Sequence, residues 1–241
     1  MSENIIDFRE LCNDPTIKST IDETVISDIF LPPANGLSVS LTFDDGPYES
    51  YTPAILDLLK EYGAKATFFV YGEFVSKFPE MAQRIVAEGH EIGNHTFTHP
   101  DLTTLTLDEL MIEIQKTEHA IKEITQSTSV LFRPPYGCFP EAAVPYVEHL
   151  GYRFVLWSRD MYLKDWELPG ADVLANRILT NVRSGSIILL HDGGGNREQT
   201  VEAVKKILPL LTQQGYQFVT VSKLITEYNK VIQNKVELEV P

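Results

Sequence analysis

Two acidic residues and two histidines have types and a spacing that suit a metal ion. Asp44 and Asp45 open an Asp-Asp-Gly-Pro segment, and His95 and His99 lie four positions apart. Adjacent side chains at a strand end point in different directions, so one carboxylate could hold a metal while its neighbour faces a substrate. Two imidazoles at this spacing converge on one ion if their segment makes a helical turn. A metal ion held by Asp45 and both histidines would keep coordination positions open for water and substrate. Such open positions are typical of catalytic metal sites and not of structural ones.

The same residues also have ordinary interpretations. Asp, Gly and Pro are common in turns, and two histidines can simply lie exposed on the surface. The segment Arg133-Pro-Pro-Tyr136-Gly contains two prolines that fix an extended backbone, which could aim the Arg133 guanidinium and present the Tyr136 amide as a donor. A stiff surface loop is the alternative for this segment.

Further along the chain, two tryptophans and a histidine follow apolar segments. We expect Trp157 to pack in the core, whereas Trp166 lies in a polar loop next to Asp165 and is the better contact for a ligand. His191 ends an apolar run and, taken alone, would be a structural residue. The triple glycine after Asp192 lacks the Lys-Ser/Thr of a phosphate-binding P-loop, so it is weak evidence for phosphate binding.

These polar residues come directly after short apolar segments that alternate with helical patterns. The predicted strands are 37–43, 66–70, 91–94, 130–132, 153–157, 186–190 and 217–221, and the predicted helices are 51–62, 79–88, 106–124, 141–150, 171–182, 198–213 and one from 222. Thr52 is a candidate N-cap, and Thr106-x-x-Glu109 is a capping box.

Strands followed by helices indicate a parallel sheet with crossover helices. About seven such units in about 200 residues favour a closed or nearly closed (β/α) barrel, and a doubly wound open sheet is the alternative. In such barrels the loops at the carboxyl ends of the strands build the site.

The composition narrows the classes of partner. The 241 residues include 20 Lys and Arg against 34 Asp and Glu, a net charge of −14. Such a chain would be repelled by nucleic acid and by anionic membranes. No run reaches about 18 apolar residues, so we expect no membrane span. Cys12 and Cys138 are expected to be free thiols.

The cellular location stays open. The first eleven residues have acidic and polar side chains where a signal peptide needs a basic start and an apolar run. The chain as written therefore looks cytoplasmic, but an exported enzyme trimmed of its signal would look the same.

Five segments together resemble the polysaccharide deacetylases, the NodB-homology enzymes of carbohydrate esterase family four. They occur in that family's order and are Thr42-Phe43-Asp44-Asp45-Gly46-Pro47, His95-Thr96-Phe97-Thr98-His99, Arg133-Pro134-Pro135-Tyr136, Asp165-Trp166 and Leu189-Leu190-His191. The resemblance covers about residues 38–225. It predicts an N-terminal extension over 1–36, a deacetylase domain over 37–230 and a C-terminal tail over 231–241.

The resemblance implies a distorted (β/α) barrel of about seven strands and one divalent metal, with Zn the first candidate and Co, Ni or Mn as alternatives. It implies that Asp45, His95 and His99 are metal ligands. By position, the catalytic base would be Asp44, oriented by Arg133, and the catalytic acid His191, tuned by Asp165. The oxyanion donor would be the Tyr136 amide, and the walls of the acetyl pocket would be Trp166 and Leu189. The loop between Asp160 and Asp165 is longer than the family's usual one, so either aspartate could support the acid.

The expected function is metal-dependent removal of acetyl groups from N-acetylglucosamine-containing polysaccharides or oligosaccharides of the peptidoglycan or chitin type. Acetylxylan O-deacetylation and hydrolysis of another small amide or cyclic imide are alternatives, and a substrate panel would separate them. A sugar-binding pseudoenzyme is a second alternative, which metal-dependent turnover would exclude. A non-haem iron oxygenase shares the His₂-carboxylate set, and oxygen-dependent turnover would identify it. The oligomeric state is left open.

Overall fold

Buried apolar strands form the centre of the fold in this computed structural model, which describes residues 4–13, 24–33 and 36–239. One sheet has seven strands, and all of its pairings are parallel. They are β2 (Leu37–Asp44), β3 (Ala66–Val70), β4 (Glu91–Asn94), β5 (Leu131–Phe132), β7 (Arg153–Phe154), β8 (Ile187–His191) and β9 (Tyr216–Phe218). Every residue of β3 is buried, as expected for a parallel strand covered on both faces.

The sheet curls until its two end strands approach each other. The order is β7-β5-β4-β3-β2-β8, and β9 pairs with the start of β2. Just after β7, the Ser158 amide donates to the Ile187 carbonyl of β8 at 3.0 Å, and Tyr162 forms a parallel bridge with Leu189. These contacts join the two ends of the sheet. The predicted distorted (β/α) barrel is therefore confirmed, and the doubly wound open sheet was the wrong alternative.

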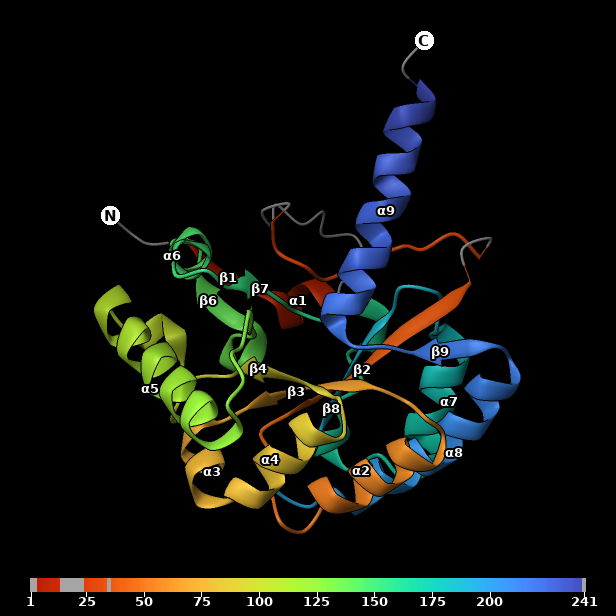
Figure 1. The fold of residues 1–241 in the computed structure, drawn as a ribbon, viewed down its shortest axis with the longest axis horizontal. Coiled ribbons are helices and arrows are strands. Elements are labelled where there is room, and N and C mark those ends of the chain that lie inside the picture. Colours follow the sequence, from red (N-terminus) through yellow and green to blue (C-terminus); the bar gives the residue numbers. More distant parts are fainter. Residues whose placement is uncertain (1–3, 14–23, 34–35, 240–241) are drawn as a thin grey trace.

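Helices follow most of the strands and surround the sheet (Figure 1). Their bounds lie close to the predicted ones. They are α2 (Thr52–Glu61), α4 (Pro79–Ala87), α5 (Leu107–Thr125), α6 (Ala143–His149), α7 (Ala171–Asn181), α8 (Glu198–Gln213) and α9 (Val221–Glu239). The short helix α3 (Gly72–Lys77) was not predicted. Its six residues are too few to show an apolar repeat.

The two predicted helix caps had different outcomes. The capping box is confirmed, because the Thr106 hydroxyl accepts from the Glu109 amide and the Glu109 carboxylate accepts from the Thr106 amide. The prediction for Thr52 was wrong. Tyr51 is the N-cap of α2, and the Thr52 hydroxyl instead donates to the buried Asp192 carboxylate at 2.5 Å.

Part of the predicted N-terminal extension packs onto the barrel. β1 (Ile5–Asp7) pairs antiparallel with β6 (Cys138–Pro140), and α1 (Phe8–Asn13) follows it directly. Phe8 is fully buried. Residues 1–3, 14–23 and 34–35 of this extension lie outside the described residues. The predicted domain boundaries remain predictions, and α9 continues through residues 231–239 as it leads away from the barrel (Figure 1).

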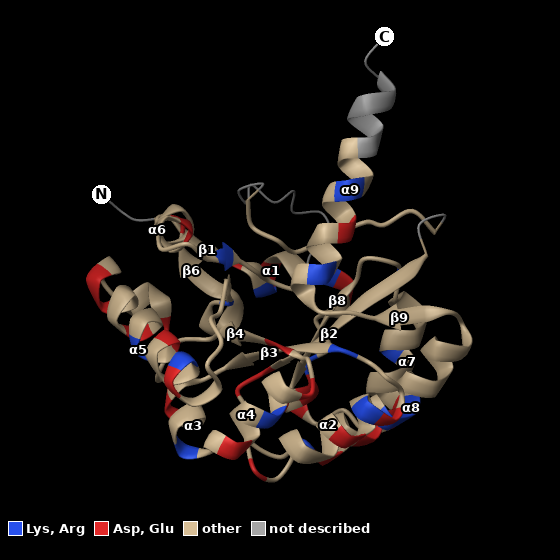
Figure 2. Ribbon diagram, in the orientation of Figure 1, with Lys and Arg blue, Asp and Glu red and all other residues tan. Residues whose placement is uncertain are grey.

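Acidic and basic residues are both spread over the outer helices, such as α5 and α8 (Figure 2). Among the described residues, no helix has the length and apolar character needed to span a bilayer. Cys12 and Cys138 are both free, as predicted.

Candidate active site

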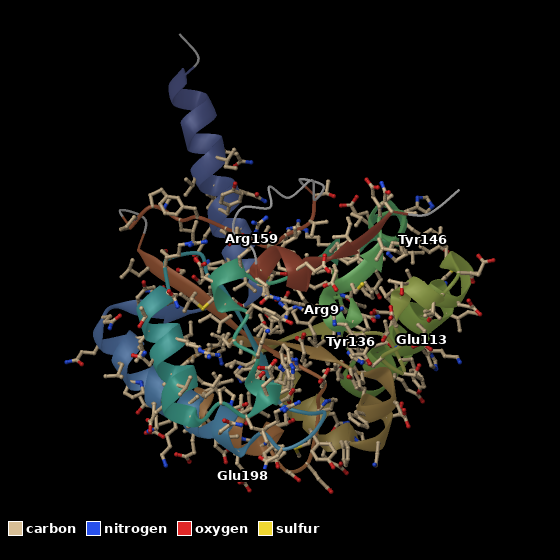
Figure 3. The ribbon with its side chains drawn as sticks, turned by 180° about the vertical axis from the view of Figure 1, so that it is seen from behind. Arg9, Glu113, Tyr136, Tyr146, Arg159 and Glu198 are labelled. Carbon is tan, nitrogen blue, oxygen red and sulfur yellow. The ribbon has the colours of Figure 1, made fainter. Side chains whose placement is uncertain are left out.

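A cavity of about 380 Å³ opens where the strands end. Asp44 lies at the end of β2 and His191 at the end of β8, while His95 follows β4 and Tyr136 follows β5. All four of these residues line the cavity, and Tyr136 can be found by its label in Figure 3. Its volume falls in the usual range for small-molecule sites, and its place is the one expected for a barrel enzyme. Four further candidates from the sequence also line it, namely Asp45, His99, Trp166 and Leu189.

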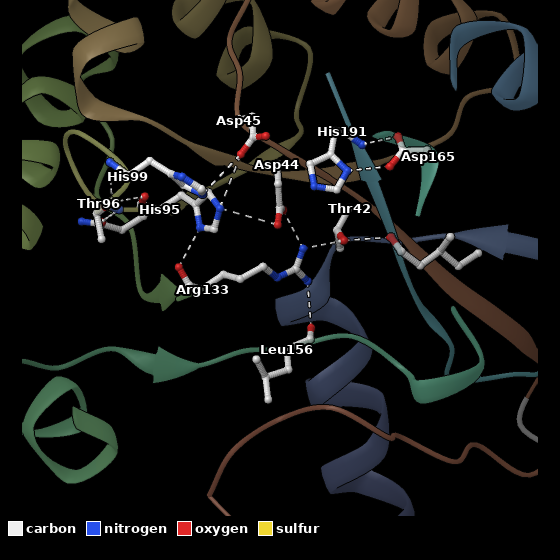
Figure 4. Close-up of polar contacts among 12 residues, drawn as sticks. Thr42, Asp44, Asp45, His95, Thr96, His99, Arg133, Leu156, Asp165 and His191 are labelled. Atoms are coloured by element: carbon white, nitrogen blue, oxygen red, sulfur yellow. Dashed lines mark hydrogen bonds and ion pairs between the residues drawn. The ribbon is translucent and has the colours of Figure 1, made fainter. Parts of the chain in front are cut away.

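Asp45, His95 and His99 form a compact set of potential metal ligands. One ligand atom from each lies within 4.8 Å of the others. The Nε2 atoms of His95 and His99 are both 3.7 Å from Asp45 Oδ1 (Figure 4). The second ring nitrogen of His95 lies 2.7 Å from the Arg133 carbonyl oxygen, which suits an Nδ1–H donor and leaves Nε2 free to bind a metal.

The protonation states of these groups fit that role. Burial lowers the pKa of His95 to about 4 and that of His99 to about 3, so both imidazoles are neutral near pH 7. Burial works against the charged form of Asp45, but the charge of His191 and the Tyr71 hydroxyl help to hold the pKa of Asp45 below its usual range. Two neutral imidazoles and a carboxylate are a donor set that divalent metals accept.

The two histidines meet through an irregular loop and not through the helical turn that their spacing of four would suit. Thr96 and His99 have φ of 68° and 58°, a left-handed conformation that is uncommon outside glycine. The Thr96 hydroxyl accepts from the His99 amide at 3.1 Å. From α5, the Glu113 carboxylate accepts from the amides of Phe97 and Thr98, both at 2.8 Å. These contacts hold the loop in the shape that brings both rings to Asp45.

Asp44 and Arg133 form a buried ion pair beside the ligand set. Arg133 is completely buried, and its Nη1 donates to Asp44 Oδ1 at 2.7 Å. The same guanidinium donates to the Thr42 hydroxyl and to the Leu156 carbonyl, both at 2.8 Å. Burial raises the pKa of Asp44 even though the Arg133 charge opposes this effect. A carboxylate held in this way is a stronger base than an exposed one.

His191 is paired with Asp165 on the other side of the cavity. His191 Nδ1 lies 2.7 Å from Asp165 Oδ1, and the His191 amide donates to Asp165 Oδ2 at 3.0 Å. Burial alone would lower the pKa of His191, but the neighbouring Asp165 charge raises it to about 9. Asp160 instead lies at the surface and pairs with Arg183 at 2.7 Å. Of the two aspartates, Asp165 is the one that contacts His191.

Aromatic side chains form one wall of the cavity. Trp166 is 37% exposed and contacts the His191 ring edge-on, with centroids 5.1 Å apart. The half-exposed Tyr136 ring lies 4.4 Å from that of His99, and its backbone is left-handed with φ of 60°. Trp157 is buried as predicted, although one side of it also reaches the cavity.

Comparisons with known proteins agree with this geometry. Residues 32–155, just over half of the chain, match the family described as polysaccharide deacetylase. The chain belongs to the polysaccharide deacetylase family.

Alignments with named relatives cover most of the chain. This chain is 43% identical over 193 residues to a peptidoglycan-N-acetylglucosamine deacetylase of Bacillus cereus, and the alignment spans 80% of this chain and 90% of the relative. It is 39% identical over 194 residues to a chitooligosaccharide deacetylase of Azorhizobium caulinodans, spanning 76% and 91% of the two chains. The solved Bc1960 peptidoglycan N-acetylglucosamine deacetylase superposes with a TM-score of 0.78 at 39% identity, covering 83% and 92%. The chain is therefore a hydrolase of the deacetylase type.

Two residues that support this deacetylase site were not singled out from the sequence. Tyr71 hydrogen-bonds Asp45, and its ring packs on that of His99 at 4.6 Å. Arg197 is buried and donates to the carbonyls of Gly193, Gly194 and Asn196, so it holds the glycine loop. No local pattern marks either residue, because their partners lie in other segments or belong to the backbone.

The glycine loop has a packing role. A Cβ atom on Gly193 would lie 2.1 Å from the Asp45 carbonyl oxygen, and one on Gly46 would lie 2.3 Å from the Asp192 carboxylate. Glycine therefore lets the β8 loop press against the turn that carries Asp44 and Asp45. This close approach places His191 next to the two acids.

Proposed function

We propose that this enzyme removes acetyl groups from N-acetylglucosamine-containing polysaccharides or oligosaccharides of the peptidoglycan or chitin type, with the help of one divalent metal ion. The observation that carries the proposal is the triangle of Asp45, His95 and His99 in one cavity with Asp44 and His191. The names of the relatives support the choice of substrate, since they act on peptidoglycan N-acetylglucosamine and on chitooligosaccharides.

The proposed metal ligands are Asp45, His95 and His99. Their two nitrogens and one carboxylate oxygen suit Zn, and Co, Ni or Mn are alternatives with compatible ligand preferences. A divalent ion at this position would supply Lewis acidity, which lowers the pKa of water and polarises a carbonyl group.

Asp44 is the proposed general base, and Arg133 orients it. Its raised pKa lets it accept a proton from the water that attacks the acetyl carbonyl. The Tyr136 amide is the proposed donor to the oxyanion that forms. Such a donor stabilises the negatively charged oxygen of the tetrahedral intermediate more strongly than it stabilises the carbonyl group of the substrate. Trp166 and Leu189 would enclose the acetyl methyl group, since both line the cavity.

His191 is the proposed general acid for the departing amine. It must carry a proton at the working pH, and the contact with Asp165 favours its charged form. As the carbon–nitrogen bond breaks, His191 gives its proton to the leaving amine nitrogen, and the acetyl group leaves as acetic acid, which ionises to acetate. The proton that Asp44 took from water then passes through solvent to His191, so that Asp44 is again charged and His191 is again protonated.

The experiment that tests this function is acetate release from N-acetylglucosamine oligomers by the purified enzyme. We expect release to fall to background after chelation and to return when Zn or Co is added. Acetate release from acetylxylan, or ring opening of a cyclic imide, without release from the oligomers would favour the alternative substrates. Bound metal with no turnover on any of them would support the sugar-binding pseudoenzyme and contradict the proposal.

The His191–Asp165 pair predicts a pH dependence. Because the pKa of His191 is raised to about 9, the rate should fall as the pH rises through that value and the acid loses its proton. Asp165→Asn removes the neighbouring charge, so the alkaline limb of kcat should move to lower pH by about one to three units.

The matched control for this prediction is Asp160→Asn, which removes the same charge from an exposed position in the same loop. Its pH profile should coincide with that of the unmodified enzyme. An unchanged alkaline limb in Asp165→Asn would contradict the role of this pair.

A further inference from the structure

We propose that the N-terminal segment adds a carboxylate-binding subsite to the catalytic cavity, with Arg9 as its recognition group. The proposal rests on the proposed deacetylase function and narrows its substrate to glycans that carry a carboxylate near the acetylated sugar. Arg9 lies outside residues 32–155, so the family match does not include it.

The segment that carries Arg9 is fixed to the barrel at several points. Ile5, Ile6 and Asp7 of β1 pair with Pro140, Phe139 and Cys138 of β6. Phe8 is fully buried and meets the Trp157 ring edge-on at 5.3 Å. The residue next to Phe8 is therefore held at a defined place beside the cavity.

Arg9 lines the same cavity as Asp44, Asp45 and His191, and Figure 3 labels it close to Tyr136. Its side chain is 39% exposed. Asp7 accepts from Nε at 2.8 Å and from Nη2 at 2.6 Å, so this carboxylate fixes one edge of the guanidinium. Within the described part of the chain, the remaining nitrogen, Nη1, has no hydrogen-bond partner. Arg9 thus has an oriented edge left for a ligand.

The other cavity arginine is not available in this way. Arg197 is 3% exposed, and backbone carbonyls of the glycine loop occupy its guanidinium. The chain as a whole carries a charge of −14. An anionic substrate would therefore need a charged hydrogen-bond donor at the cavity, and Arg9 can offer the guanidinium edge that Asp7 leaves free.

The position of Arg9 indicates which part of a glycan it would meet. A series of ring contacts leads from His191 through Trp166, Tyr162 and Trp157 to Phe8, with neighbouring centroids 5.1 to 5.6 Å apart. The proposed acid stands at one end of this series of rings, and Phe8, the residue before Arg9 in the chain, stands at the other. A group bound by Arg9 would accordingly belong to a sugar beside the one that loses its acetyl group.

A guanidinium with a free edge pairs best with a planar oxyanion such as a carboxylate. The lactyl side chain on every second sugar of a peptidoglycan strand ends in a free carboxylate where the strand carries no stem peptide, whereas N-acetylglucosamine oligomers have no carboxylate. The geometry thus favours a peptide-free strand of the peptidoglycan type over a chitin-type oligomer.

The test compares three glycans of equal length with the metal-loaded enzyme. They are a neutral N-acetylglucosamine oligomer, a strand alternating N-acetylglucosamine with N-acetylmuramic acid, and that strand with its carboxylates amidated. We expect the unmodified enzyme to prefer the acidic strand over its amidated form. Arg9→Gln should lower kcat/KM for the acidic strand about tenfold, mainly through KM, and should change the values for both neutral glycans less than about twofold.

Lys205→Gln is the matched charge control, because Lys205 is exposed on α8 and does not line the cavity. It should leave all three values unchanged, and Arg9→Lys should restore part of the preference. If Arg9→Gln lowered kcat/KM equally for all three glycans, Arg9 would have a merely structural role and the subsite would be overturned. An unmodified enzyme with no preference for the acidic strand would also overturn it. Turnover of none of the glycans by the metal-loaded enzyme would instead contradict the deacetylase function itself.

Discussion

Asp44→Asn is expected to lower kcat for acetate release by about 10²–10⁴-fold while leaving the bound metal in place. Asparagine keeps the shape of the side chain and an oxygen that can face Arg133, but it cannot accept a proton from water. Asp44 Oδ2 also lies 3.7 Å from His95 Nε2, beside the ligand set and not within the triangle. The measurement is the initial rate of acetate release together with the metal content of the same sample.

Asp45→Asn is the matched control, since it makes the same chemical change at the neighbouring residue. Asp45 belongs to the proposed ligand set, so this variant should lose metal as well as activity. The two adjacent aspartates would then be separated by metal content. Metal-loaded Asp44→Asn with a rate near that of the unmodified enzyme would contradict the role of Asp44 as base.

Arg133→Leu is expected to lower the free energy of unfolding by about 3–5 kcal/mol, because it leaves Asp44 buried without its partner. Arg133 is completely buried and donates to Asp44 and Thr42 of β2 and to the Leu156 carbonyl just after β7, so its removal affects two parts of the sheet at once. Urea unfolding of the metal-free proteins measures the change without the contribution of a bound ion.

A double-mutant cycle separates the charge pair from the packing. Asp44→Asn combined with Arg133→Leu should recover part of the loss, because the buried negative charge is then gone. Arg183→Leu is the control at an exposed pair, where Arg183 contacts Asp28 and Asp160, and it should cost only about 0–1 kcal/mol. If Arg133→Leu cost no more than Arg183→Leu, the buried pair would not stabilise the fold as argued.

The chain order of strands and helices was predictable from the sequence because the signals are local. β3 and β4 have the predicted bounds, since each is a short, largely buried segment and a turn with Gly63 or Gly89 precedes it. The capping box at Thr106 and Glu109 joins residues three positions apart and needs no other part of the chain. The resemblance to polysaccharide deacetylases rested on short motifs in their order, and the family match agrees with it.

Contacts between distant segments were decided by the tertiary structure alone. Asp160 and Asp165 are equivalent candidates in the sequence, and only the placement of His191 next to Asp165 separates them. The convergence of the two histidines was made conditional on a helical turn, but Glu113 binds the loop amides from another element and stabilises an irregular path.

The sequence by itself determined most of the elements that surround the site and which chemical groups follow the strands, because apolar periodicity, caps and turns act over a few residues. The tertiary structure decided how those groups combine, as in the burial of Arg133 against Asp44 and the docking of β1 on β6, which brings Arg9 to the cavity. No local pattern encodes such pairings, because Arg133 and Asp44 are 89 positions apart and the paired residues of β1 and β6 are more than 130 positions apart.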